Sequence, residues 1–411
     1  MAASKKIVIL GGSYGGISTA HYLLKHAIPH LPGDGYEIVL ISRSSQVMCR
    51  PACPRAMISD DMFDQAKLFV SIDKQFEQYP KESFTFIHGS AKRLDHESRV
   101  VSVNLASGDV ETIEYYALVI ATGASTASPL LGLNGDASEL KAEWEAFRQV
   151  LPKAKTIVIS GGGPAGIEVA GELGEYLNGQ PGWFGGISTH PKVSITVYTA
   201  GSQILPVLRP SIAKNAEDLL SKVGVTVVKT TRVKSVDAIG GGDVHATSKA
   251  IISLDDGNRV EADLYIPATG TKPNTDFINA SLLASDGRVD TNQSTLRVDK
   301  AGPRVYSIGD VSSAARPAIH LILDAIPVLC GNIKRDLLLD SAVKNGLVGE
   351  DRMLREDTRE TQMVPIGKSK GVGAAMGYRL PSFLVWLIKG RDYWLWKTGG
   401  LWSGKQWAKE T

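Results

Sequence analysis

The chain has 411 residues, more than one ordinary domain needs and enough for two or three. Its 45 Lys and Arg residues nearly balance its 43 Asp and Glu residues, so no nucleic-acid partner is expected from charge. Three cysteines cannot form a disulfide framework, and an odd number is typical of a reducing compartment. The sequence shows no secretory leader and no run of about 18 apolar residues, so we expect a cytoplasmic protein that is neither secreted nor membrane-spanning.

The N-terminal residues predict one βαβ unit. Residues 6–10 (KIVIL) form a short apolar run, typical of a parallel strand covered on both faces. The turn GGSYGG follows at residues 11–16, then a helical pattern over 17–26 and a second strand over 36–41. Such a turn places the backbone and a helix N-terminus beside a pyrophosphate. The unit therefore predicts a dinucleotide site, with Ser13 in place of the middle glycine of the GxGxxG pattern.

A second unit of the same architecture begins near residue 155. Residues 156–160 (TIVIS) predict a strand, residues 167–177 a helix, and residues 193–199 (VSITVYT) the next strand. The turn between the first strand and the helix carries the complete glycine pattern, with Gly161, Gly163 and Gly166. Two such units in one chain predict two bound dinucleotides.

Small-residue turns close both halves of the chain. Ala121-Thr122-Gly123 follows the apolar strand at residues 118–120, and Ala268-Thr269-Gly270 follows residues 265–267. Small residues there let the backbone approach a nucleotide closely. Further on, the strand predicted at residues 304–311 ends in Gly309-Asp310, where a carboxylate could hold the ribityl hydroxyls of a flavin. We therefore assign FAD to the first unit and NADH or NADPH to the second.

The ribose positions leave the choice between NADH and NADPH open. An acidic residue is expected at the end of the second strand of each unit, where it would bind the ribose hydroxyls. The sequence has Ser42-Arg43 and Thr199-Ala200 instead. Arg43 could stack on adenine or reach a phosphate, or it could be a solvated surface charge.

These motifs resemble those of the two-dinucleotide-binding flavoproteins, over essentially the whole chain. Within that superfamily the chain is similar to the apoptosis-inducing-factor-like (AMID or ferroptosis-suppressor) NAD(P)H:quinone oxidoreductases. Two segments carry the branch resemblance: PACPR at residues 51–55, and residues 364–391, where a Gly-Val-Gly turn precedes FLVWLIKGRD. The resemblance implies an electron-transfer enzyme with FAD, a nicotinamide donor and a quinone or other small-molecule acceptor.

The resemblance also implies roles for three side chains. Glu168 matches the family glutamate beside nicotinamide and flavin, Lys389 the lysine at the quinone site, and Arg55 an arginine that contacts FAD. The residues themselves leave alternatives open, since Glu168 could be a helix-start carboxylate and Lys389 a surface lysine. No metal site is predicted. The expected cofactor contacts are Gly11, Gly12, Ser13, Tyr14, Gly15, Gly16, Arg43, Arg55, Ala91, Ala121, Thr122, Gly123, Gly161, Gly163, Gly166, Gly270, Gly309 and Asp310.

The acceptor is open to three interpretations. The first is a quinone. The second is a disulfide, because Cys49 and Cys53 follow the first βαβ unit, where disulfide reductases of this superfamily keep their redox thiols. Their CxxxC spacing, stiffened by Pro51, departs from the usual pair. The third is a pathway-specific compound of secondary metabolism.

The C-terminal residues combine an apolar stretch with a basic, tryptophan-rich tail. Five of the seven tryptophans lie between Trp386 and Trp407. Such a segment suits peripheral contact with a membrane, for example the mitochondrial outer face or a lipid droplet. The alternative is a helix packed over the flavin with a latched tail. Residue 2 is alanine, so the family's myristoylated glycine is not carried over.

We therefore predict an α/β protein with two Rossmann-like domains and a C-terminal α+β region. The FAD-binding domain comprises residues 1–125 and 275–325, and the NAD(P)H-binding domain residues 150–272. Residues 326–411 are expected to shape the acceptor site.

Overall fold

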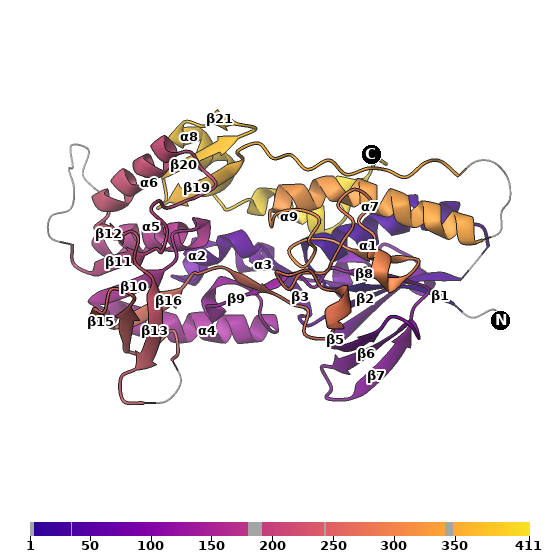
Figure 1. The fold of residues 1–411 in the computed structure, drawn as a ribbon, viewed down its shortest axis with the longest axis horizontal. Coiled ribbons are helices and arrows are strands. Elements are labelled where there is room, and N and C mark those ends of the chain that lie inside the picture. The colour runs from indigo at the N-terminus through magenta and orange to yellow at the C-terminus, as the bar shows by residue number, and fades with distance from the viewer. Residues whose placement is uncertain (1–3, 34, 180–190, 242–243, 342–347) are drawn as a thin grey trace.

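The computed structural model describes residues 4–33, 35–179, 191–241, 244–341 and 348–411. Figure 1 shows two lobes side by side. One combines the N-terminal residues with residues near 300, and the other is built from the middle of the chain. The C-terminal residues, in yellow, lie along the top of both lobes.

A seven-stranded sheet forms the centre of the first lobe. Its order is β18-β8-β1-β2-β5-β6-β7, parallel from β18 to β5 and antiparallel beyond. The predicted strands and the first helix are confirmed, and the sheet pairs strands from both ends of the predicted FAD-binding region. The elements are β1 (Lys5–Leu10), α1 (Tyr14–His26), β2 (Tyr36–Ser42), β5 (Phe84–Asp95), β6 (Val100–Leu105), β7 (Val110–Glu114), β8 (Ala117–Ile120) and β18 (Val305–Ser307).

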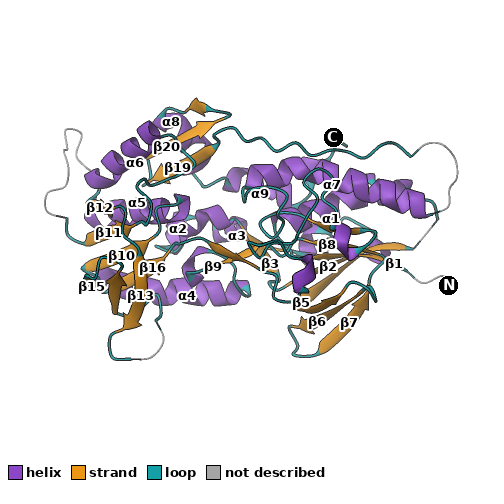
Figure 2. Cartoon of the chain, viewed as in Figure 1, coloured by secondary structure: helices purple, strands orange, loops and turns teal. Residues whose placement is uncertain are grey.

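A parallel sheet of order β12-β11-β10-β16 forms the second lobe. Its strands and first helix match those predicted for the second βαβ unit, and Figure 2 shows helices beside this sheet. A three-stranded antiparallel sheet is attached to it. The elements are α4 (Ala137–Val150), β10 (Thr156–Ser160), α5 (Pro164–Asn178), β11 (Ser194–Tyr198), α6 (Pro210–Lys222), β12 (Val225–Val228), β13 (Val233–Ala238), β14 (Ala250–Leu254), β15 (Arg259–Ala262) and β16 (Leu264–Pro267).

Two short segments join the lobes. β9 (Ala124–Thr126) and β17 (Thr271–Pro273) each follow an Ala-Thr-Gly turn, and they pair with each other as an antiparallel ribbon. The segment between β2 and β5 lies nearby and carries β3 (Gln46–Met48), α2 (Cys53–Ala56), α3 (Gln65–Leu68) and β4 (Phe69–Ser71). The ribbon fixes both small-residue turns at the boundary between the lobes.

The C-terminal region bridges both lobes. β19 (Gln362–Ile366) packs on α5 and β20 (Lys370–Ala375) on α6, with β21 (Tyr378–Arg379) at the edge. After α8 (Ser382–Val385) and the π-helical turn Trp386–Gly390, α9 (Leu395–Trp402) returns to α1. Among the helices that the structure describes, none has the length and apolar character required to cross a bilayer.

The predicted boundary at residue 325 falls inside a helix. α7 (Ile319–Asp340) runs unbroken through that position and packs along α1. Its apolar side chains, including Ile326, Leu329 and Ile333, enter the same core as those of β1. The first lobe therefore continues to the end of α7, because this helix covers the sheet beside α1.

Candidate active site

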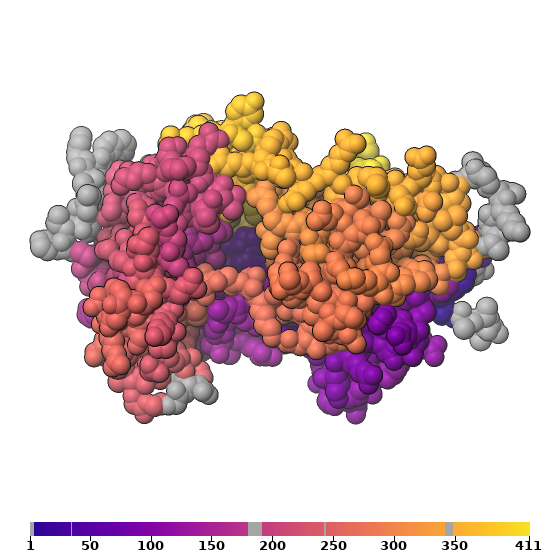
Figure 3. Space-filling view, in the orientation of Figure 1, coloured from indigo at the N-terminus to yellow at the C-terminus, as the bar shows by residue number. Residues whose placement is uncertain are grey.

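One cavity follows the boundary between the lobes. Its volume is about 1170 Å³, and it is lined by both glycine turns, both Ala-Thr-Gly turns and the Gly309-Asp310 segment. Figure 3 shows the molecule hollowed between the two lobes. Open parallel sheets bind ligands beyond the carboxyl ends of their strands, and both βαβ units turn those ends toward this cavity. A single cavity therefore connects the two predicted nucleotide sites.

The two glycine turns share one backbone geometry. Gly11 has a φ of +117° and Gly161 a φ of +119°. A Cβ on either residue would lie 2.2 Å from a carbonyl oxygen, that of Ala121 or Ala268. Only glycine adopts this conformation in so little space. The turns, each leading into the N-terminus of a helix at the cavity, therefore fit the pyrophosphates of two dinucleotides.

We expect Gly11→Ala to lose bound FAD and to cost roughly 1–3 kcal/mol of stability through overpacking. Gly163→Ala is the matched comparison, because no protein atom lies within 4 Å of a Cβ at Gly163. That variant should keep its FAD and raise the KM for NAD(P)H. FAD content after purification and thermal unfolding measure the difference. Full FAD content in Gly11→Ala would show that this turn does not hold the cofactor.

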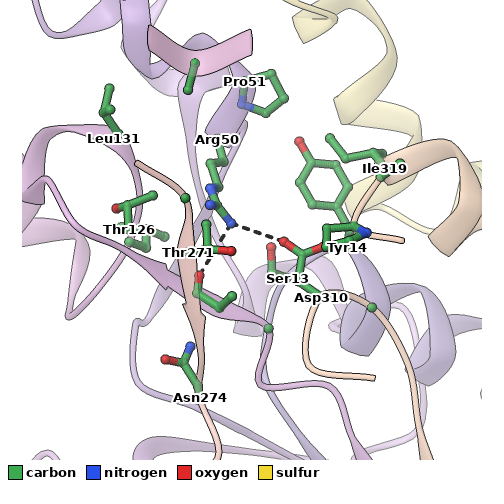
Figure 4. Close-up of a pocket in the computed structure, with 18 of the residues that line it drawn as sticks. Ser13, Tyr14, Arg50, Pro51, Thr126, Leu131, Thr271, Asn274, Asp310 and Ile319 are labelled. Carbon is green, nitrogen blue, oxygen red and sulfur yellow. Dashed lines mark hydrogen bonds and ion pairs between the residues drawn. The ribbon is translucent and has the colours of Figure 1, made fainter. Parts of the chain in front are cut away.

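Asp310 faces the cavity and is paired with an arginine that the motifs did not predict. Arg50 Nη1 lies 3.3 Å from Asp310 Oδ2 and donates to Ala124 O at 3.4 Å. Figure 4 shows this pair, with Ser13 and Tyr14 beside Asp310. The pair joins positions 260 residues apart, so no local pattern indicates it. The carboxylate is placed to bind flavin hydroxyls, and Arg50 is the cation beside it.

The structure places Arg55 outside the cavity, in contrast to the role that the resemblance implied. Its Nε and Nη2 bind the two carboxylate oxygens of Glu172 at 2.9 and 2.8 Å, and Tyr393 donates to the same carboxylate at 2.8 Å. Arg55 also donates to the carbonyl of Gly390 at 2.8 Å. The guanidinium of Arg55 is buried and fully engaged, so Arg55 connects α2, α5 and the C-terminal segment. Arg50, five residues before it, lines the cavity instead.

Two predicted glycines also lie behind the cavity wall. A Cβ on Gly16 would lie 1.7 Å from Gly11 O, and one on Gly166 would lie 2.1 Å from Gly161 O. These glycines bring each helix close to its turn. The other predicted residues all line the cavity: Gly11, Gly12, Ser13, Tyr14, Gly15, Arg43, Ala91, Ala121, Thr122, Gly123, Gly161, Gly163, Glu168, Gly270, Gly309, Asp310 and Lys389.

Glu168 and Lys389 form a buried ion pair in the cavity wall. Lys389 Nζ lies 2.5 Å from Glu168 Oε1 and also donates to Met363 O at 3.0 Å. Their side chains are 5% (Glu168) and 9% (Lys389) exposed. Burial raises the pKa of Glu168 to about 7, although the Lys389 charge opposes this shift. The pair can therefore hold a proton and a positive charge at the cavity near neutral pH.

The π-helical turn and the residues after it hold Lys389 in place. π-helical turns are often found at functional sites. Tyr393 and Trp394 have φ values of +51° and +70°, which residues other than glycine seldom adopt. The Trp394 side chain lines the cavity, with its ring 5.2 Å from Lys389 Nζ. No sequence motif indicates that Trp394 lines the cavity or that its backbone has a positive φ.

Cys49 and Cys53 are free thiols packed in the core. Burial raises the pKa of Cys49 to about 11 and that of Cys53 to about 12. Cys49 Sγ donates to Tyr393 O at 3.1 Å, and neither cysteine lines the cavity. Because the thiolate is the reactive form of cysteine, burial of both thiols away from the cavity disfavours a redox role for them.

Arg43 and Ala91 line the cavity at the first lobe. Arg43 Nη1 donates to Asn134 O at 2.5 Å, so this exposed side chain is held beside the cavity. In the second lobe, Thr199 and Ala200 line the corresponding position after β11, without a carboxylate.

Comparison with known proteins agrees with this geometry. The model of the pyridine nucleotide-disulphide oxidoreductase family matches residues 5–327. A protein named Oxidoreductase phnG from Penicillium herquei is 62% identical, over 99% of this chain and 98% of the relative. Oxidoreductase ptaL from Pestalotiopsis fici is 31% identical, over 94% and 95%. Ferroptosis suppressor protein 1 from Taeniopygia guttata is 24% identical, over 97% and 96%.

Solved structures share the fold at lower identity. The sulfide:quinone oxidoreductase from Aquifex aeolicus is 17% identical with a TM-score of 0.71, over 97% of this chain and 92% of that one. NDH2 from Plasmodium falciparum in complex with NADH is 14% identical with a TM-score of 0.67, over 99% of both chains. The chain belongs to the pyridine nucleotide-disulphide oxidoreductase family and is an oxidoreductase that binds FAD and NAD(P)H.

Proposed function

We propose that this protein passes two electrons from NAD(P)H, by way of FAD, to a quinone-type acceptor. The Glu168–Lys389 pair carries this proposal, because it lies in the wall of the cavity that both nucleotide turns share. When bound, FAD supplies a group that accepts hydride and passes the electrons on.

The residues around the pair suit a flat acceptor with a carbonyl oxygen. A quinone that becomes a hydroquinone gains two electrons and two protons. The Lys389 ammonium can stabilise the negative charge that develops on the acceptor oxygen, and Glu168 can hold a proton at its carboxyl group. Trp394 and Met363 add an aromatic and an apolar surface to the same wall.

The proposal includes two kinds of acceptor. Sulfide:quinone oxidoreductase has a quinone in its name and shares the fold, which supports a quinone acceptor. The 62% identical relative is named only as an oxidoreductase, and a pathway-specific aromatic compound with a quinone-type carbonyl remains the second candidate. Both acceptors would use Lys389 in the same way.

A turnover assay separates these acceptors. The holoenzyme is mixed with NADH or NADPH and, in parallel, with a short-chain ubiquinone, a polycyclic aromatic quinone or oxidised glutathione. We expect rapid oxidation of the nucleotide with at least one quinone and none with glutathione. Faster turnover with the polycyclic quinone would favour the pathway-specific acceptor. No turnover with any quinone would refute the proposal.

Replacing Cys49 and Cys53 together with alanine should leave quinone turnover within about twofold of the wild type, because neither thiol reaches the cavity. The turnover assay described above measures this rate with a quinone as the acceptor, and a parallel reaction with oxidised glutathione measures any disulfide reduction. Loss of turnover in a variant that keeps its FAD and its thermal stability would restore the thiol–disulfide mechanism.

We further propose that the C-terminal region contacts a lipid surface. The five tryptophans of the tail have different environments. Trp402 and Trp407 are buried against α1, and Trp394 lines the cavity. Trp386 and Trp396 are exposed. Exposed Phe383 and Leu387 lie on the same helical stretch as Trp386. Besides the buried Lys389, residues 361–409 contain seven exposed Lys or Arg residues and one acidic residue, Asp392, so this region suits an anionic lipid surface.

Sedimentation with vesicles tests the lipid contact. We expect binding to phosphatidylserine-rich vesicles and weaker binding to phosphatidylcholine vesicles, and the Phe383→Glu/Leu387→Glu variant should lose most of it. Leu339→Glu is the control, because Leu339 is exposed on α7, away from this region. Equal binding by all three proteins, or no binding by the wild type, would contradict the proposal.

A further inference from the structure

The nucleotide end of the second βαβ unit contains a cation that the motif does not include. β12 leads into Thr230 and Thr231, whose amides donate to Gly201 O and Thr199 O, both at 3.0 Å. These bonds place the segment after β12 directly beside the segment after β11. The next residue, Arg232, therefore lines the cavity together with Thr199.

The backbone of Arg232 is fixed, whereas its side chain is available. Its amide donates to Asp255 Oδ1 at 2.9 Å, and its carbonyl accepts from the Asp255 amide at 3.0 Å. Within the described ranges, no carboxylate or carbonyl binds its guanidinium. The nearby Asp256 is engaged with Asn258 at 2.9 Å, and neither aspartate lines the cavity. The guanidinium is thus a positive charge at the cavity edge without a counterion from the chain.

The charge of Arg232 lies beside a ribose site that has no carboxylate after β11. A carboxylate after the second strand favours NADH, since it accepts from both ribose hydroxyls and repels a phosphate. Here that place is taken by Thr199 and Ala200, which are neutral and small. A guanidinium beside a neutral ribose site matches the doubly charged 2′-phosphate that distinguishes NADPH from NADH.

We propose that Arg232 binds the 2′-phosphate of NADPH and makes the enzyme select NADPH over NADH. Arg232 lies in the segment after β12, whereas the dinucleotide motif places its specificity residue after β11. It would therefore reach the ribose site from the neighbouring segment. This inference rests on the nucleotide half of the proposed function and is independent of the acceptor.

The binding of nucleotide fragments tests the role of Arg232 without any enzyme turnover. The FAD-loaded protein is titrated calorimetrically with 2′,5′-ADP, which carries the 2′-phosphate, and with 5′-AMP, which lacks it. We expect 2′,5′-ADP to bind at least tenfold more tightly. Arg232→Ala should remove most of this preference and leave the 5′-AMP affinity unchanged, whereas Arg232→Lys should keep part of it. Lys234→Ala is the control, because Lys234 is exposed and does not line the cavity.

A kinetic measurement on the same variants completes the test. In the wild type, NADPH should reduce FAD faster than NADH does. The ratio of the two rates should fall by roughly 10- to 100-fold in Arg232→Ala, because only the reaction with NADPH becomes slower. Equal affinity of the wild type for the two fragments would overturn the inference, as would a similar loss for both fragments in Arg232→Ala. If neither nucleotide reduces FAD, the proposed function fails, while the fragment titrations still decide the role of Arg232.

Discussion

Replacing Lys389 with methionine is expected to slow quinone reduction by roughly 10²- to 10³-fold, while reduction of FAD by NAD(P)H changes far less. The reason is that methionine keeps the apolar stem but removes the ammonium group that faces the acceptor region. Stopped-flow measurement of the two half-reactions separates these effects. Lys397→Met is the matched control, because Lys397 is exposed on α9.

The pH dependence of the quinone half-reaction provides a second signature. Burial holds the pKa of Glu168 near 7, so its carboxyl group is protonated below that pH and ionised above it. Ionised Glu168 neutralises Lys389 and has no proton to give, so we expect the rate to fall as the pH rises through about 7. The other charged groups near the pair are Glu172 and Arg55. Glu168→Gln should flatten the profile, and an unchanged profile would contradict the assigned role.

A slower quinone reaction in Lys389→Met must be distinguished from a loss of protein stability. Removing one partner of a buried ion pair costs about 3–5 kcal/mol because the other charge remains buried. In Lys389→Met the carboxyl group of Glu168 can become protonated, which limits this cost. The Glu168→Gln/Lys389→Met double variant should therefore recover stability and still reduce quinone slowly. Recovery of quinone turnover in the double variant would show that Lys389 only balances Glu168.

Replacing Arg55 with methionine should destabilise the protein by about 3–5 kcal/mol. The change leaves the carboxylate of Glu172 buried with only the Tyr393 hydroxyl, and it removes donors from the carbonyls of Gly390 and Gly367. These groups hold the C-terminal segment that carries Lys389. Urea unfolding followed by FAD fluorescence measures the loss, and protease cleavage in the C-terminal region reports its release.

An exposed ion pair in the same region provides the control. Arg209 binds Glu360 and so also ties the second lobe to the C-terminal region, but its side chain is 46% exposed. Arg209→Met should therefore lose much less stability than Arg55→Met. The Arg55→Met/Glu172→Met double variant should recover part of the loss. If Arg55→Met matched Arg209→Met in stability and instead lost FAD, Arg55 would be a cofactor ligand after all.

Local patterns in the sequence predicted the parallel strands and the turns between them. Residues 156–160 and the glycines after them are sufficient to predict β10 and its turn, because a few neighbouring residues determine both a buried parallel strand and a tight turn. The helices begin slightly earlier than expected, at Tyr14 and Pro164, since the last residues of each glycine turn already form the first helical turn. The boundary inside α7 was misplaced because packing on α1 decides where that unit ends.

Contacts between distant residues could not be predicted. Glu168 and Lys389 were both identified, but from a resemblance and as separate groups, and their ion pair joins positions 221 residues apart. Arg50, Arg55 and Arg232 look alike in the sequence. Only the fold shows that Arg55 is buried with Glu172 and that the other two line the cavity.

Electron transfer from NADPH through FAD to a quinone is tested most directly by stopped-flow absorbance of the FAD band at about 450 nm. The FAD-loaded protein is mixed anaerobically with NADPH, and the reduced protein is then mixed with a quinone. We expect the nucleotide to bleach the band and the quinone to restore it rapidly. A protein that retains no FAD, or a reduced protein that reacts no faster with quinone than free reduced flavin does, would contradict this electron transfer.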